Sequence, residues 1–341
     1  MTRIYLDTNQ WIKLLSIQQG KVNDEQLKKI FAAIKKLTKS DDIKVVFSIF
    51  TLEEIWKHSD KEKRDNLIDL IIDISKGYVL KPFDIFLNKE IENAVYFVLE
   101  NKYIHDIYSE ILGKGLADLV GYSFEKMNQE NPIKWNLLKN NSYGIPEEFF
   151  REDFQKFSED LDVLRKNLKD RKSEDVINTQ LEGIKKHLKD LEEYRFKNSD
   201  MSKEMFSRYI HARGFIDSII PHLTIFLHSR EISPEKIFEE NGKKKYLIFK
   251  EHLKSFNVFS ILCLERDFGA EKQIISNDVF DMAHLSGAIP YCDVIVTEHM
   301  FAHISKIKKL DKMYDCVILD DLRYLSNIEP IKSKIKKIEM I

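Results

Sequence analysis

Short apolar runs bounded by polar residues occur near both ends of the chain and predict buried strands. These runs are rich in Ile, Val and Leu, and they cover residues 3–6, 44–48, 293–297 and 316–319. A further run, residues 78–80, predicts another short strand just before Pro82. Apolar residues at spacings of three and four predict helices over residues 9–19, 24–39, 51–56 and 66–75. Strands separated by helices predict an α/β fold whose parallel sheet is covered on both faces.

The long middle of the chain, residues 86–269, has a different pattern. Its periodicity is helical, and almost no strand is indicated there. Two leucine-rich runs, from Leu161 to Leu168 and from Leu181 to Leu191, are separated by a polar link over residues 170–175. This arrangement predicts an antiparallel helical hairpin.

Composition narrows the class of protein. The 341 residues are 43% hydrophobic and 32% charged, which is typical of a soluble globular protein. The formal net charge of −2 excludes an overall field that would attract nucleic acid, so a polyanion would need local lysines or bound cations. Three widely spaced cysteines, Cys263, Cys292 and Cys316, argue against a disulfide framework. We therefore expect a cytoplasmic protein with no membrane partner.

Acidic residues follow the first two predicted strands. Asp7 and Asn9 stand between a strand and a helix, where they either cap the helix or supply part of a metal site. Glu53 and Glu54 lie early in the next helix, a position that the helix dipole favours by itself. Neighbouring helical residues point about 100° apart, so one of the two glutamates at most can face a given pocket.

Two further acidic segments lie near the end of the chain. Asp278, Asp281 and His284 recur every three residues and share one helical face, where a cation or a basic side chain should offset the two carboxylates. Thr297 and Glu298 follow an apolar strand, at the edge where ligands bind in parallel α/β sheets. Asp278, Asp281 and His284 could instead lie on a helix face in water, although the residues that flank them are apolar. His284 could equally have a hydrogen-bonded structural role.

Taken in order, these four segments resemble the PIN-domain nuclease family. On that resemblance Asp7, Glu54 and Asp281 are the first three acids, with Asp278 as a competitor for the third place or an additional metal ligand. Glu298 stands where the family usually has an aspartate as the fourth catalytic acid. Asn9 and Thr297 match the polar residues that support the site, and His284 is a candidate helper. The resemblance covers roughly residues 1–85 and 270–341, so residues 86–269 would be an all-helical insertion.

The resemblance implies a metal-dependent endoribonuclease that leaves a 5′-phosphate and a 3′-hydroxyl. Clustered carboxylates raise one another's pKa unless cations neutralise them, and oxygen ligands suit Mg²⁺ or Mn²⁺. The implied partner is an RNA substrate. A role as a toxin or defence effector, an inhibitor or antitoxin-like partner protein, and assembly into a homo-oligomer all stay open. The candidate RNA-binding clusters are residues 28–29 with 35–36, 165–172, 185–186, 243–245 and 306–309.

Three other interpretations stay open. A PIN-like module that has lost catalysis would bind RNA or act as a scaffold, and the departure at Glu298 motivates it. A DNA nuclease of the related flap-endonuclease type is another. Finally, Cys292, His299 and His303 could suggest zinc, although no fourth ligand stands at a recognisable spacing.

Overall fold

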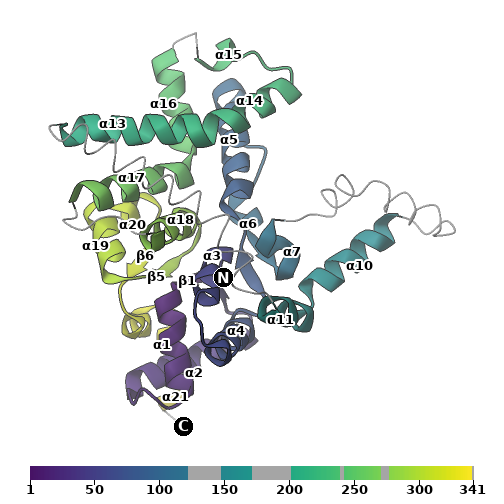
Figure 1. Cartoon of the computed structure of the whole chain (residues 1–341), viewed down its shortest axis with the longest axis vertical. Helices are drawn as coiled ribbons and strands as arrows, with labels where there is room; N and C mark the ends of the chain where they lie inside the picture. Colours follow the sequence, from purple (N-terminus) through teal and green to yellow (C-terminus); the bar gives the residue numbers. More distant parts are fainter. Residues whose placement is uncertain (122–146, 171–200, 239–241, 270–275, 340–341) are drawn as a thin grey trace.

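A four-stranded parallel sheet forms the centre of the molecule (Figure 1). The computed structural model describes residues 1–121, 147–170, 201–238, 242–269 and 276–339. The sheet has the order β2-β1-β5-β6, and its strands are β1 (Thr2–Leu6), β2 (Ile43–Val46), β5 (Val294–Val296) and β6 (Val317–Leu319). Both chain ends therefore supply strands to one sheet, and the predicted α/β class with a parallel sheet is confirmed.

Alternating side chains along the strands divide the interior into two cores. On β1, Ile4 and Leu6 point to one face and Tyr5 points to the other, and all three side chains are fully buried. Helices cover both faces, so the sheet has no broad surface in water. The strands are consequently mostly apolar, as the sequence pattern predicted.

Helical segments from both ends of the chain line the face that carries Ile4 and Leu6. They are α1 (Thr8–Gln18), α2 (Glu25–Lys39), α4 (Lys61–Ser75), the 3-10 helix η2 (Leu322–Asn327) and α21 (Ile331–Glu339). Helix α4 begins five residues earlier than its apolar pattern predicted, because the Asp60 side chain accepts a hydrogen bond from the Lys63 amide at 3.1 Å and caps the helix there.

The opposite face is covered by helices from the second half of the chain. These are α17 (Lys254–Gly269), α18 (Ser276–Tyr291), α19 (His299–Ile307) and α20 (Leu310–Met313). Helix α3 (Ile49–Trp56) follows β2 and contacts both α4 and α18. The carboxyl ends of β1, β2 and β5 therefore meet near the start of α3 and the first turns of α18.

The middle of the chain is largely helical, as predicted. Besides α17, its described helical segments are α5 (Phe83–Glu100), α6 (Ile107–Glu110), α7 (Gly115–Val120), α10 (Glu147–Glu159), α11 (Leu161–Asp170), α13 (Lys203–Gly214), the π-helix η1 (Phe215–Ile219), α14 (Ile220–Ser229), α15 (Glu235–Phe238) and α16 (Gly242–His252). Helices α13 to α16 extend to one end of the molecule, at the top of Figure 1. Residues of η1, α14, α15 and α16 pack with α5 around a third core.

Two details of the middle differ from the sequence prediction. A short strand, β4 (Leu112–Lys114), lies within the region where almost no strand was expected, and it pairs antiparallel with β3 (Tyr78–Leu80) in a separate sheet. The sequence did not predict β4 because a strand of three residues, one of them a glycine, is too short to show a pattern of apolar residues. The second leucine run of the predicted hairpin lies outside the described residues.

Some helices of the middle also contribute to the cores of the main sheet. Leu164 and Leu168 of α11 pack in the same core as Ile4, and Val258 and Leu262 of α17 pack in the same core as Tyr5. The division into a PIN-like domain and an insertion stays a prediction. None of the described helices has the length and apolar character needed to cross a bilayer.

Candidate metal centre

Asp7 lies where β1 passes into α1, at the carboxyl edge of the sheet. Its amide donates to the Val296 carbonyl at 3.0 Å, which continues the pairing of β1 with β5. Its Oδ1 accepts from the Thr8 amide at 2.6 Å, and its Oδ2 accepts from the Thr297 hydroxyl at 3.3 Å. Asp7 therefore caps α1 as expected for a helix N-cap, and its buried carboxyl group also faces the end of β5.

Glu54 is positioned by the way α3 begins. Ser48 caps the helix by accepting from the Thr51 amide at 3.4 Å, and Thr51 returns a contact to the Ser48 amide. Leu52 and Ile55 are then fully buried in the sheet core, which fixes the rotation of the helix. This rotation directs Glu54 toward the end of β1.

Asp281 completes a group of three carboxylates. It comes from α18 and is 5% exposed. Asp7, Glu54 and Asp281 each offer one carboxylate oxygen, and these three atoms lie within 4.8 Å of one another. The oxygens come from three elements far apart in sequence, and their spacing fits ligands that converge on one hard cation such as Mg²⁺ or Mn²⁺.

Mutual repulsion and burial perturb these acids strongly. Burial raises the pKa of Asp7 first, and the charges of Glu54 and Glu298 raise it further. The pKa of Asp281 is raised by burial and then by Asp7 and Glu54. Burial also raises the pKa of Glu54, while the Thr8 hydroxyl and the Lys57 ammonium oppose that rise. At neutral pH the group must hold protons or a cation, because the interior cannot accommodate the full negative charge.

Glu298 lies beside this group at the end of β5. It is half-buried, it precedes the first residue of α19, and its side chain makes no cap to that helix. It faces Asp281, where its charge and a hydrogen bond both raise the pKa of the aspartate. The structure therefore brings the longer fourth acid next to the group of three, although it is not one of the three converging ligands.

Asp278 has a different partner. Its Oδ2 accepts from the Arg266 guanidinium of α17 at 2.7 Å, and both side chains are buried. The basic side chain that the acidic helix face predicted is thus an arginine, and it neutralises Asp278 rather than Asp281. We leave Asp278 out of the candidate metal centre for this reason.

His284 is fully enclosed on the same helix face. Its Nδ1 is hydrogen-bonded to the Tyr5 hydroxyl, and its ring stacks on Phe50 with centroids 5.1 Å apart. Burial lowers its pKa to about 3, so the imidazole is neutral at physiological pH. These contacts fit a structural residue that joins α18 to β1 and α3.

The polar neighbours of the acids differ partly from those expected. Thr297 contacts Asp7 as the resemblance implied, whereas Asn9 is exposed. Thr8 and Lys57, which both affect Glu54, were missed in the sequence. Thr8 precedes Asn9 in the same motif, and Lys57 follows Glu54 by three residues, so helical spacing could have indicated the lysine.

The alternative zinc interpretation receives no support from the described residues. Cys292 is buried, and the His299 Nδ1 is hydrogen-bonded to Asp320 at 2.8 Å. Within the described ranges, the acids Asp7, Glu54 and Asp281 form the one group of three or more candidate metal ligands.

Several basic residues proposed for RNA contact are paired with acids. Arg165 and Lys169 lie 3.1 and 2.6 Å from Asp69, and Lys308 lies 2.7 Å from Glu265. These pairs join neighbouring helices, which reduces the positive charge available to a phosphate. The clusters at 171–172 and 185–186 fall outside the described residues, and RNA contact stays a prediction for all the clusters.

Comparison of the chain with protein-family models, with curated proteins and with solved structures finds no match.

Proposed function

We propose that the protein is a metal-dependent endoribonuclease with a PIN-like active site. The observation that carries this proposal is the convergence of Asp7, Glu54 and Asp281 oxygens within 4.8 Å at the carboxyl edge of a parallel sheet. These three residues would hold Mg²⁺ or Mn²⁺, because their hard oxygen donors suit either ion. When bound, such an ion lowers the pKa of water and stabilises charge that develops on a phosphodiester.

The chain's own residues have distinct parts in this proposal. The Thr8 amide and the Thr297 hydroxyl fix the orientation of the Asp7 carboxylate from opposite sides. Glu298 is half-buried beside Asp281, and it is the carboxylate placed to accept a proton from the attacking water. Burial of Asp7 and Asp281 excludes bulk water from the inner part of the group.

Incubation of the purified protein with mixed-sequence single-stranded RNA tests the proposal. We expect cleavage in Mn²⁺ or Mg²⁺ and none in EDTA, with 5′-phosphate ends on the products. A parallel reaction with single-stranded and flap DNA distinguishes a ribonuclease from a DNA nuclease, because only the latter would cut these substrates. RNA binding without cleavage of either substrate would instead favour the inactive PIN-like module, which the glutamate at position 298 motivates.

The adjacent glutamates of α3 provide a matched pair of variants. Glu54→Gln should lower the cleavage rate on the order of 100-fold, because it removes an anionic ligand from the group of three. Glu53→Gln should retain cleavage within a fewfold of the wild type, since Glu53 is not one of the three converging ligands. Initial rates at saturating Mn²⁺ measure both effects. Equal losses in the two variants would contradict the assignment of Glu54.

Thr297→Val should weaken metal binding without abolishing cleavage. The substitution keeps the shape of the side chain and removes the hydroxyl that donates to Asp7 at 3.3 Å. Outer partners of metal ligands typically contribute about 10- to 100-fold in affinity. Titration of activity with Mn²⁺ should therefore shift to higher concentration, while the rate at saturation changes little. An unchanged titration curve would show that this contact does not support Asp7.

A further inference from the structure

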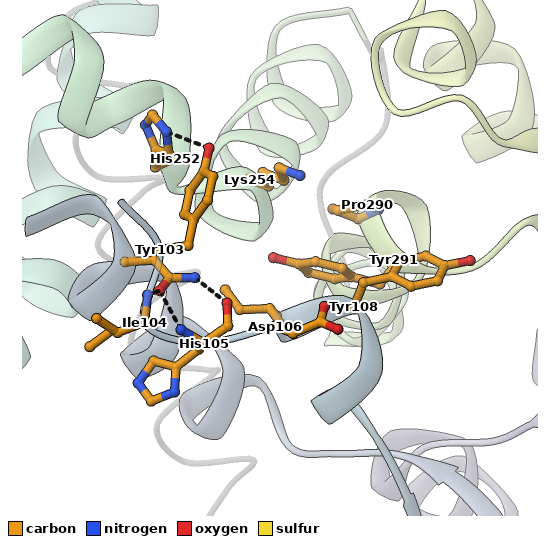
Figure 2. Close-up of a pocket in the computed structure, with 11 residues that line it drawn as sticks. Tyr103, Ile104, His105, Asp106, Tyr108, His252, Lys254, Pro290 and Tyr291 are labelled. Atoms are coloured by element: carbon orange, nitrogen blue, oxygen red, sulfur yellow. Dashed lines mark hydrogen bonds between the residues drawn. The ribbon is translucent and has the colours of Figure 1, made fainter. Parts of the chain in front are cut away.

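A cavity lies at the opposite edge of the sheet from the acids. Its volume is about 430 Å³, within the range of small-molecule sites. Tyrosine, histidine and lysine side chains dominate its lining (Figure 2), which consists of Asn93, Tyr103, Ile104, His105, Asp106, Ile107, Tyr108, His252, Lys254, Pro290 and Tyr291.

The two ends of β1 separate this cavity from the candidate metal centre. Arg3, near the start of β1, packs its guanidinium over the Tyr108 ring at 3.6 Å, whereas Asp7 follows the end of the same strand. Four residues of strand span roughly 13 Å. Helix α18 covers a similar path, because Asp281 and Tyr291 are separated by ten residues, or roughly 15 Å of helix. The cavity is therefore a separate site.

Hydrogen bonds at the hydroxyl tips hold the tyrosine rings of the cavity. The Tyr108 hydroxyl donates to Asp293 at 2.9 Å, and the Tyr291 hydroxyl donates to the buried Glu90. The Tyr103 hydroxyl is hydrogen-bonded to the His252 Nε2 at 2.9 Å, as Figure 2 shows. Such contacts fix the ring planes before a ligand arrives, which lowers the entropic cost of binding.

The loop that carries Tyr103 and leads to Tyr108 in α6 is also held in place. The Asn93 side chain accepts from the Ile104 and His105 amides, both at 2.9 Å, and donates to the His105 carbonyl at 2.9 Å. Tyr103 is nevertheless 60% exposed and Tyr108 47% exposed. Tyr103 thus keeps much of its side chain in water on an ordered backbone, as in a preformed stacking surface, whereas the Arg3 guanidinium covers one face of the Tyr108 ring.

Charges of both signs accompany the aromatic faces. Lys254 is exposed at the first turn of α17, and its ammonium lies 5.9 Å from the centre of the Tyr291 ring. Asp106 also lines the cavity, and its carboxylate accepts one hydrogen bond, from the Ser109 amide at 3.3 Å. A simple anion would be attracted by the lysine and repelled by the aspartate, and a purely apolar ligand would use neither.

We propose that this cavity binds a nucleotide, with the base stacked on the exposed ring of Tyr103 and the phosphate on Lys254. The Asp106 carboxylate would accept N–H groups from the edge of the base. A free mononucleotide and a nucleotide within an RNA strand share this chemistry, and the experiment below distinguishes them. The assignment does not depend on the metal centre, because all of its residues lie at the other end of β1.

Isothermal titration of the full chain with AMP tests the proposal, with EDTA present so that no RNA is cut. The variants are Lys254→Gln and Tyr103→Leu. Their matched controls are Lys312→Gln, which removes another exposed lysine, and Tyr324→Leu, which removes a tyrosine that is 52% exposed. Thermal melting confirms that each variant is folded. Inorganic phosphate and a short single-stranded RNA oligonucleotide are titrated in the same way.

We expect AMP to bind, and we expect both cavity variants to lower its affinity at least about tenfold while both controls leave it unchanged. Tighter binding of the oligonucleotide than of AMP would identify an RNA strand as the ligand, and the reverse order would identify a free nucleotide. Three results would overturn the proposal: neither ligand binds, inorganic phosphate binds as tightly as AMP, or either cavity variant binds normally. None of these results affects the nuclease proposal, since cleavage depends on Asp7.

Discussion

Replacement of Asp7 by asparagine should abolish most RNA cleavage and leave the metal-free protein at least as stable as the wild type. Asparagine keeps the shape of the side chain, and its oxygen can still accept the hydrogen bond from the Thr8 amide. The substitution removes a buried carboxyl group whose pKa is raised by burial and by Glu54 and Glu298. The substitution therefore lowers the repulsion among the acids and removes one of the three anionic ligands for a cation.

The loss of cleavage should be on the order of 10²- to 10³-fold, as is typical when one preorganised electrostatic group is removed from an active site. Initial rates on single-stranded RNA in Mn²⁺ and thermal melting in EDTA measure the two effects. Asp24→Asn is the matched control, because Asp24 is also a helix N-cap, accepting from the Leu27 amide at 3.0 Å in α2. Equal cleavage by Asp7→Asn and the wild type would contradict the proposed function.

In the absence of metal, the three acids of the candidate metal centre should contribute less stability to the protein as the pH rises from 5 to 8. The pKa values of Asp7, Glu54 and Asp281 are all raised in the folded state by burial and by neighbouring carboxylates. The folded state therefore binds more protons than the unfolded chain. The stabilisation is complete below the unfolded pKa values near 4 and is lost as the pH rises through the folded ones.

A divalent cation should reverse this trend at high pH. The ion replaces the protons, so Mn²⁺ at about 100 times its dissociation constant should add about 2.7 kcal/mol at pH 8 and much less at pH 5. Thermal melting across the pH range, with Mn²⁺ or EDTA, measures the difference. A melting temperature in EDTA that changes between pH 5 and 8 in the same way for the wild type and for Asp7→Asn would contradict the account.

Glu90 provides the control for this experiment. It is fully buried among α5, α17 and α18, where it accepts from the Ser255 amide and hydroxyl, and burial raises its pKa to about 7. The contribution of Glu90 to stability therefore also falls as the pH rises, but a cation at the metal centre does not change this contribution. Glu90→Gln should leave the effect of Mn²⁺ intact, whereas Asp7→Asn should remove most of it.

The sequence predicted the main elements of the fold because apolar period and strand composition are local properties. The strands at 3–6, 293–297 and 316–319 form as expected, with ends that differ by a residue or two. Strand β3 also forms, but it pairs with β4 in a second sheet, since pairing depends on contacts across the chain rather than on local pattern. The start of α4 was misplaced because its cap, Asp60, precedes a polar first turn without apolar residues.

The candidate site was predicted in part for the same reason. Asp7 directly follows a strand, so its place at the carboxyl edge of a parallel sheet could be anticipated, whereas the choice of Glu54 and Asp281 came from the resemblance to the PIN-domain family. The pairing of Asp278 with Arg266 could not, because the arginine belongs to another helix and no local spacing relates the two residues. The aromatic cavity likewise depends on α5, α6, α17 and α18 lying together, which no single segment encodes.

The most direct test of the metal centre is a crystal structure of the protein soaked in Mn²⁺, with anomalous diffraction recorded at the manganese edge. We expect an anomalous peak among the carboxylate oxygens of Asp7, Glu54 and Asp281, with Glu298 beside it. Peaks found only elsewhere, or none at a Mn²⁺ concentration that supports cleavage, would contradict the account.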